Sequence, residues 1–156
     1  MRQGLFYILS QEDEPQAPLA AHFAVACQLA AYHYQQGQKV FIATDDQTQA
    51  FAIDEYLWQF DGDSFIPHNL SGEGPKYGAP VEIGWQKPKQ RRQVLINLRK
   101  IAPEFATEFA QVVDFVPCAE DLKAAARLRY QAYRQQGINL ATKPLGPSSD
   151  ATPVTK

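Results

Sequence analysis

Short runs of apolar residues alternate along the chain with longer segments in which apolar residues recur every three or four positions. The short runs are typical of strands buried on both faces, and the longer segments are typical of amphipathic helices. We expect strands at residues 5–9, 39–43, 64–66, 81–85, 94–98 and 112–116. We expect helices at residues 19–36, from the cap residues 44–46 to about 60, at 103–109 and at 119–136.

The order of these elements predicts the fold class. Alternation of strands and helices is typical of a mainly parallel sheet with helices on both faces. The sequence therefore predicts one α/β domain, Rossmann-like but without a phosphate loop, over residues 1–141. Towards the C-terminus glycine, proline, serine and threonine predominate, and we expect residues 142–156 to form a disordered tail.

Composition narrows the classes of function. The 156 residues carry a formal net charge of -2, which gives no reason to expect binding to nucleic acid through overall charge. Cys27 and Cys118 are too far apart in the sequence to resemble a metal-binding pair, and two cysteines make no disulfide framework. There is no signal-peptide pattern, and no apolar run reaches the roughly 20 residues of a membrane span. We expect a cytoplasmic protein that does not bind a membrane.

A nucleotide-binding enzyme is the first alternative for a domain of this class. Its phosphate loop would follow the first strand and contain spaced glycines, but residues 10–15 (SQEDEP) have no glycine and three acids. The glycine loop around Gly72 and Gly74 follows no clear strand-to-helix turn. His22 and His33 are three helical turns apart and cannot share a metal. The sequence predicts no catalytic site, no metal and no cofactor.

The last predicted helix carries a stripe of cations around an aromatic ring. Its members are spaced by four, three and four residues, which places them on one helix face. They are Lys123, Arg127, Tyr130 and Arg134. Such a face could bind a short acidic peptide or a chain-end carboxylate, although similar stripes occur on ordinary solvated helices.

Large apolar side chains gather near the end of the second predicted helix. They are Trp58, Phe60, Phe65 and Ile66. These side chains form part of the core or an apolar patch that a partner covers, and the pattern alone leaves both alternatives open. A basic turn at residues 87–92 is interpreted as solvated surface, with direct contact to DNA as the alternative.

Several segments together resemble a known family. Residues 65–75 (FIPHNLSGEGP) are the most specific, and residues 78–83 (GAPVEI) follow them. Further matching segments are residues 6–7, 37–40, 54–58, 112–117 and 129–134. These segments resemble the chi subunit of bacterial DNA polymerase III, the HolC family. The resemblance covers about residues 4–140, and its central motif is long and ungapped.

The resemblance implies a non-catalytic accessory subunit of the clamp-loader assembly of the DNA polymerase III holoenzyme. On one side it implies binding of the psi subunit, with Trp58 and Phe65 in the apolar patch. On another it implies binding of the acidic C-terminal tail of single-stranded DNA-binding protein, which ends in a phenylalanine carboxylate. Residues implied for this tail site are Val116, Lys123, Arg127, Tyr130 and Arg134. DNA would then be contacted only indirectly.

One position departs from the family pattern. A basic residue directly follows the tyrosine in that pattern, whereas Gln131 stands here. Lys123, Arg129 or Arg134 would then compensate for the missing cation, or the affinity for the tail would be lower. A last alternative for the other side is an adaptor of the same family that serves a repair helicase in place of psi, through the same apolar patch.

Overall fold

Seven strands and three α-helices make up the parts of the chain that the computed structural model describes, which are residues 2–10, 20–59, 66–71 and 79–145. The strands are β1 (Gln3–Ile8), β2 (Val40–Ala43), β3 (His68–Leu70), β4 (Val81–Gly84), β5 (Val94–Asn97), β6 (Gln111–Val116) and β7 (Asn139–Pro144). The helices are α1 (Ala21–Gln35), α2 (Gln47–Trp58) and α3 (Glu120–Gln135), with a 3-10 helix, η2 (Glu104–Glu108), before β6.

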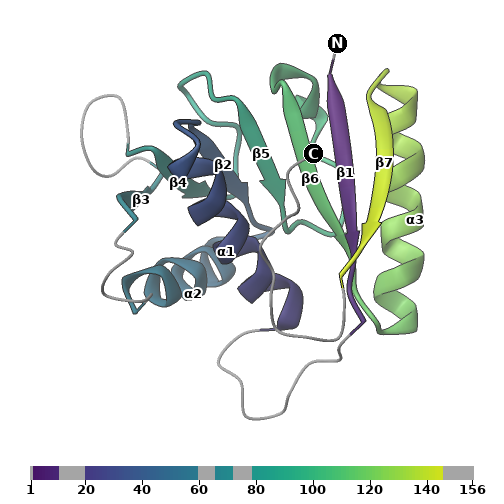
Figure 1. The fold of residues 1–156 in the computed structure, drawn as a ribbon, viewed down its shortest axis with the longest axis horizontal. Coiled ribbons are helices and arrows are strands. Elements are labelled where there is room, and N and C mark those ends of the chain that lie inside the picture. The colour runs from purple at the N-terminus through teal and green to yellow at the C-terminus, as the bar shows by residue number, and fades with distance from the viewer. Residues whose placement is uncertain (1, 11–19, 60–65, 72–78, 146–156) are drawn as a thin grey trace.

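The strands form one sheet in the order β3-β4-β2-β5-β6-β1-β7, and every neighbouring pair is parallel (Figure 1). All residues of the central strands β2 and β5 are buried, as expected for strands covered on both faces. The predicted α/β class is confirmed. None of the described helices is long and apolar enough to cross a membrane.

Two apolar clusters fill the space on either side of the sheet. Side chains alternate between the faces of a strand, so Ile42 packs in one cluster and its neighbour Phe41 packs in the other. The first cluster contains residues of α1 and α2, and the second contains residues of α3 and η2. The helices therefore cover both faces, as the alternation of elements predicted.

The expected helix ends have clear physical causes. Asp46 caps α2 by accepting a hydrogen bond of 2.9 Å from the backbone N–H of Gln49. Gly37 and Gly137 follow α1 and α3 with φ of 79° and 84°, a left-handed conformation that strains other residues. Asp46 is one of the expected cap residues 44–46, and the two glycines directly follow residues 36 and 136, at which these helices were expected to end.

The third strand was placed wrongly. We expected it at residues 64–66, closed by Pro67, whereas β3 begins after that proline at His68. Residues 64 and 65 lie outside the described part of the chain. Polar residues are accommodated in β3 because their side chains are bonded: the amide oxygen of Asn69 accepts a hydrogen bond from the N–H of Ala79.

The seventh strand was not expected at all. β7 pairs with β1 from Asn139 to Pro144, so residues 142–144 belong to the sheet, beyond the expected boundary at 141. Its residues are mostly exposed and form no apolar run, which is why the pattern gave no signal. The remainder of the expected tail, from 146, lies outside the described residues.

Candidate functional site

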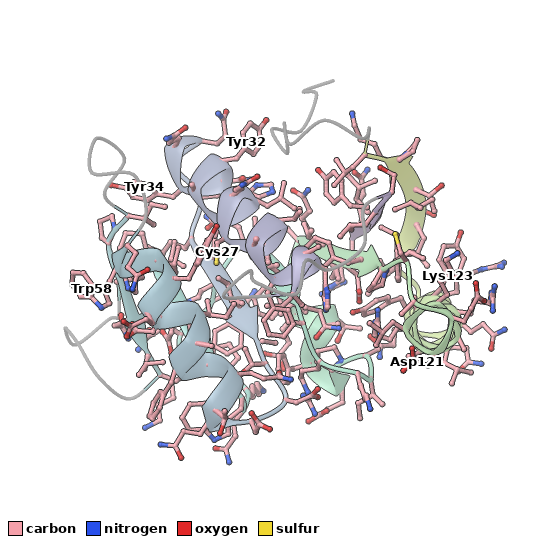
Figure 2. The ribbon with its side chains drawn as sticks, turned by 90° about the horizontal axis from the view of Figure 1, so that it is seen from below. Cys27, Tyr32, Tyr34, Trp58, Asp121 and Lys123 are labelled. Carbon is pink, nitrogen blue, oxygen red and sulfur yellow. The ribbon has the colours of Figure 1, made fainter. Side chains whose placement is uncertain are left out.

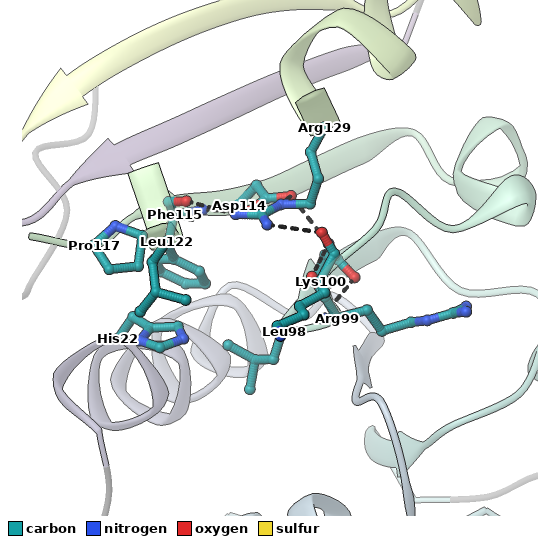
Figure 3. A pocket seen from close by; sticks show the side chains of 10 residues that line it. His22, Leu98, Arg99, Lys100, Asp114, Phe115, Pro117, Leu122 and Arg129 are labelled. Carbon is teal, nitrogen blue, oxygen red and sulfur yellow. Dashed lines mark hydrogen bonds and ion pairs between the residues drawn. The ribbon is translucent and has the colours of Figure 1, made fainter. Parts of the chain in front are cut away.

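Helix α3 is held against the sheet by a buried ion pair between Arg129 and Asp114 (Figure 3). The guanidinium Nε of Arg129 donates to both carboxylate oxygens of Asp114, at 3.0 and 3.1 Å. Its two remaining nitrogens donate to the carbonyl oxygens of Lys100 at 3.0 Å and Phe115 at 2.9 Å. Arg129 therefore ties α3 to β6 and to the segment after β5.

Three further donors complete the surroundings of the Asp114 carboxylate. The Tyr133 hydroxyl donates to it at 2.7 Å, the Asn97 amide at 3.0 Å and the backbone N–H of Phe115 at 2.6 Å. Burial raises the pKa of Asp114, and the Arg129 guanidinium together with these donors opposes the rise. Burial and the adjacent Asp114 carboxylate raise the pKa of Tyr133 well above its usual value, so its hydroxyl remains a donor.

This anchoring turns the cationic stripe of α3 outward. Arg127 and Arg134 are exposed, while Lys123 and Tyr130 are half-buried. Within the described residues the guanidinium of Arg127 makes no hydrogen bond or ion pair. The ammonium of Lys123 lies 3.5 Å from the exposed carboxylate of Glu120, a surface pair of little energetic weight. The four stripe residues thus share one accessible face.

Apolar surface adjoins the cations of this stripe. The ring of Tyr130 packs on Phe6 of β1, with the ring centroids 5.4 Å apart. Val116, at the carboxyl end of β6, is half-buried and packs against the same cluster as Tyr130. Val116 and Tyr130 therefore border one apolar cluster, and Tyr130 lies one helical turn from the exposed Arg127.

The expectation that Arg129 could supply the cation missing at Gln131 is wrong. Arg129 is 7% exposed, and its guanidinium is occupied by internal partners. Arg134 lies beside Gln131 instead, and together with Gln135 these residues line a shallow surface depression. Of the compensating cations considered, Lys123 and Arg134 remain.

The second candidate surface lies on α2. Trp58 is 60% exposed, and its ring packs edge-on against the ring of His68, with centroids 4.8 Å apart. His68 is buried, and its Nδ1 lies 2.8 Å from the carbonyl oxygen of Ile66. Its Nε2 lies 3.3 Å from the carboxylate of Asp54, at angles outside hydrogen-bond geometry. Trp58 is therefore a surface residue seated on β3, whereas Phe65 lies outside the described residues.

One exposed aromatic on this helix was not expected from the sequence. Phe51 is 48% exposed and stands seven residues before Trp58. Two aromatics seven positions apart on a predicted helix share a face. That spacing was readable from the sequence, but the pattern did not say whether the face pointed inward or outward.

The basic turn at residues 87–92 is less cationic than its sequence suggests. Lys87 pairs with Glu108 at 2.7 Å. Arg92 is buried, and its guanidinium donates to the Glu82 carboxylate at 2.8 Å and to the carbonyl oxygen of Pro80 at 3.0 Å. Lys89 and Arg91 are exposed. Much of the positive charge in this turn therefore serves the fold.

In the described part of the chain a small space lies beyond the carboxyl ends of β5 and β6, the position at which parallel α/β sheets usually bind ligands. The space between the ends of β5 and β6 measures about 40 Å³ and is bordered by His22, Asp114 and Arg129 (Figure 3). Small-molecule sites usually measure about 300–1,000 Å³, so this space is too small for a nucleotide. Among the described residues no group of three or more His, Cys, Asp or Glu could hold a metal ion. The exposed surfaces on α3 and on α2 are the candidate binding sites.

Comparisons with known proteins agree with one another. The profile of the family described as "DNA polymerase III chi subunit, HolC" matches residues 1–141. The protein named DNA polymerase III subunit chi of Escherichia coli K12 is 46% identical over 144 residues, which cover 91% of this chain and 97% of that protein. Its namesake from Haemophilus influenzae is 48% identical over 124 residues, covering 78% and 86% respectively. Its namesake from Pseudomonas aeruginosa is 37% identical over 136 residues, covering 86% and 91%.

Proposed function

The chain belongs to the DNA polymerase III chi subunit family, and from this premise we propose that it is a non-catalytic accessory subunit that connects two partners in the replisome. One partner is the acidic C-terminal tail of single-stranded DNA-binding protein, bound on α3. The other is the psi subunit of the clamp-loader assembly, bound on α2. The protein would act in the cytoplasm, where it would meet DNA only through its partners.

The outward face of α3 supports the tail-binding half of this proposal. An acidic peptide that ends in a phenylalanine carboxylate needs cations for its charges and apolar contact for its ring. Arg127 is exposed and has no internal partner among the described residues, so its guanidinium is available for a carboxylate. Tyr130, one helical turn further along α3, offers apolar surface next to it, and Val116 packs against the same cluster as Tyr130. This pairing of a free guanidinium with an apolar cluster is the observation on which the proposal chiefly rests.

The replacement of the usual cation by Gln131 changes the expected strength of binding. Lys123 and Arg134 flank Arg127 and Tyr130 on the stripe, but each is one helical turn from them. They would contribute a longer-range attraction to an acidic peptide. Salt screens such an attraction, with a screening length of about 10 Å at 0.1 M ionic strength. We therefore propose tail binding with a steep dependence on salt.

Exposed Trp58 supports the psi-binding half. A tryptophan ring that is 60% exposed carries a large apolar area, and such rings are enriched at the centres of protein interfaces. Contact with His68 holds the ring in place before a partner arrives, which lowers the entropy lost on binding.

The two surfaces are far enough apart to be occupied together. α2 and β3 lie at one end of the molecule and α3 and β7 at the other (Figure 1). A view turned by 90° again places Trp58 and Lys123 at opposite ends (Figure 2). Seven strands at about 4.8 Å spacing separate the two sheet edges by about 29 Å. An adaptor needs this separation because one partner must not displace the other.

Tail binding is tested by fluorescence anisotropy with a labelled acidic peptide that ends in a free Pro-Phe carboxylate. Arg127→Ala is expected to weaken binding about tenfold or more, since a hydrogen bond to a charged group contributes about 1.5–3 kcal/mol. Arg91→Ala, which removes an exposed arginine from the basic turn, is the matched control and should bind like the wild type. Equal losses in both variants would mean that the peptide senses only overall charge.

Psi binding is tested by isothermal titration of the purified psi subunit. Trp58→Ala is expected to weaken binding by tenfold or more, as truncation of a central interface tryptophan usually does. Psi binding that is unaffected by Trp58→Ala would contradict the placement of psi on α2, and a wild-type chain that binds neither psi nor the tail peptide would refute the adaptor function.

A further inference from the structure

The outer face of α2 presents two aromatic side chains, Phe51 and Trp58, in line along the helix axis. Seven residues are almost two full turns, so the two side chains point within about 20° of each other and lie about 10 Å apart along the axis. They are 48% and 60% exposed. The helix is already anchored to the core by three buried residues on its inner face, Ala50, Ile53 and Leu57. Packing within the described chain therefore leaves much of both aromatic surfaces uncovered.

Acidic side chains occupy the helical turn between the two aromatics. Glu55 is exposed and Asp54 is half-buried. The elements that pack against α2 are α1, β3 and β4, and none of them contains a lysine or arginine. Residues 40–75 as a whole contain seven acids and neither lysine nor arginine. The negative charge of this face therefore has no lysine or arginine on its own or its neighbouring elements, and the titratable group that faces it is the imidazole of His68 on β3, 3.3 Å from the Asp54 carboxylate.

The opposite end of the molecule has the opposite charge. α3 carries two acids in its first turn and, after them, four basic residues: Lys123, Arg127, Arg129 and Arg134. β7 adds a fifth basic residue, Lys143. Arg129 is neutralised inside the fold by Asp114, which leaves the stripe as the exposed charge. An acidic peptide is attracted to α3 and repelled by α2, and a basic peptide behaves in the opposite way.

We propose that the surface formed by Phe51, Asp54, Glu55 and Trp58 binds a basic amphipathic helix of its partner. Two apolar side chains of that helix, about two turns apart, cover Phe51 and Trp58, and lysine or arginine side chains between them pair with Asp54 and Glu55. A partner helix fits because its own side chains repeat at the same spacing of about 10 Å. Because the outer backbone groups of α2 are already bonded within the helix, the partner binds through side chains and not by strand addition.

This inference rests on the proposed binding of psi and deepens it. It adds a second aromatic anchor, Phe51, and it specifies the chemistry of the psi segment that docks. It also gives the adaptor a means to keep its partners apart, since the acidic tail would be repelled from the psi surface.

The test is titration calorimetry of the full chain with the purified psi subunit, at low and high salt. Phe51→Ala and Glu55→Lys are each expected to weaken binding at least tenfold, and Glu55→Lys should also reduce the dependence on salt. Ile101→Ala removes another exposed apolar side chain, which is 63% exposed, and serves as the control for Phe51. Glu104→Lys makes the same charge change on η2 and serves as the control for Glu55. Both controls should bind psi within about twofold of the wild type.

The outcomes separate this inference from the proposed function. If Trp58→Ala weakens psi binding while Phe51→Ala and Glu55→Lys bind like the wild type, psi binding on α2 stands and this inference is overturned. If Phe51→Ala weakens binding but Glu55→Lys does not, the basic character of the partner helix is overturned. If the wild type does not bind psi, both the proposed binding of psi on α2 and this inference are refuted. Because the changed positions are exposed or at the surface, equal melting temperatures confirm that each variant is folded, and Glu55→Gln provides a milder charge change.

Discussion

Loss of the Arg129 guanidinium is expected to destabilise the fold, whereas loss of the neighbouring Arg127 guanidinium is not. Arg129→Met is the most informative change because methionine retains much of the apolar stem and removes only the charged head. It breaks the bonds to Asp114 and to the carbonyl oxygens of Lys100 and Phe115. Arg127→Met makes the same chemical change at an exposed position two residues away.

The magnitude follows from what remains buried. Removal of one partner of a buried ion pair costs about 3–5 kcal/mol, because the other charge is left unpaired. Asp114 keeps donors from Tyr133, Asn97 and its following N–H, so we expect the lower end of that range, about 3 kcal/mol. For a chain of this size the melting temperature should fall by roughly 6–12 °C. Arg127→Met should change the free energy of unfolding by less than about 0.5 kcal/mol.

Urea unfolding followed by circular dichroism measures these free energies. Asp114→Asn should also lower the free energy of unfolding by about 3 kcal/mol, because it leaves the buried Arg129 cation without its carboxylate partner. The double variant leaves neither charge unpaired, so its loss should be about 3–4 kcal/mol and well below the sum of about 6 kcal/mol. Additive losses, or an Arg129→Met protein as stable as Arg127→Met, would refute the reasoning that Arg129 and Asp114 form a structural unit.

Three further predictions concern single buried or strained residues. A thiol reagent at pH 8 should modify Cys118 in the native protein and Cys27 only after unfolding, because Cys27 is buried and burial raises its pKa to about 12; rapid loss of two thiols would contradict this. Burial lowers the pKa of His33 in the folded protein. Below a pH of about 6.5, the pKa of histidine in the unfolded chain, the unfolded state therefore binds the proton more readily than the folded state, and the free energy of unfolding falls as the pH falls. His33→Gln should therefore show a shallower loss of stability between pH 7 and 5 in urea unfolding, and parallel curves would contradict the assignment. Gly137→Ala should cost about 1 kcal/mol of unfolding free energy because Gly137 has a φ of 84°, and an unchanged urea midpoint would show that the turn relaxes without strain.

Buried salt bridges of this kind are weak arguments for stability in themselves, since desolvation offsets much of the attraction. The Arg129–Asp114 pair matters here because of where it holds α3. Arg127 and Tyr130 flank Arg129 in the helix, so fixing the direction of Arg129 also fixes the directions of its neighbours. We expect the pair to set the orientation of the stripe for which tail binding is proposed, as well as to secure the helix.

The sequence was informative about the alternation of buried strands and helices because both faces of this sheet are covered. A strand such as β2, buried at all four residues, must be apolar along its whole length, and that run is visible without coordinates. Caps and end glycines were equally readable, because Asp46 and Gly137 act through local backbone geometry. The family resemblance was carried by residues that include Trp58 and Tyr130, and the family itself is confirmed.

Strands β3 and β7 were not predictable in the same way. Both lie at edges of the sheet, where one neighbour is enough to define a strand and the residues need not be apolar. The backbone of β7 is ordered by pairing with β1, which is more than 130 residues earlier in the chain. No local pattern records a partner at that distance.

What the sequence determined by itself was the class of fold and the family, because the alternation of buried strands with helices and the matching motifs express these directly. Only the tertiary structure decided which of those residues are available. Arg129 and Arg127 are chemically identical and two positions apart, yet Arg129 is buried in an ion pair with Asp114 and Arg127 faces solvent. Likewise Arg92 is buried with Glu82, and Phe51 lies on the surface. The physical reason is that burial and pairing depend on what the rest of the chain places opposite a side chain, and that is settled only when the sheet and its helices have packed.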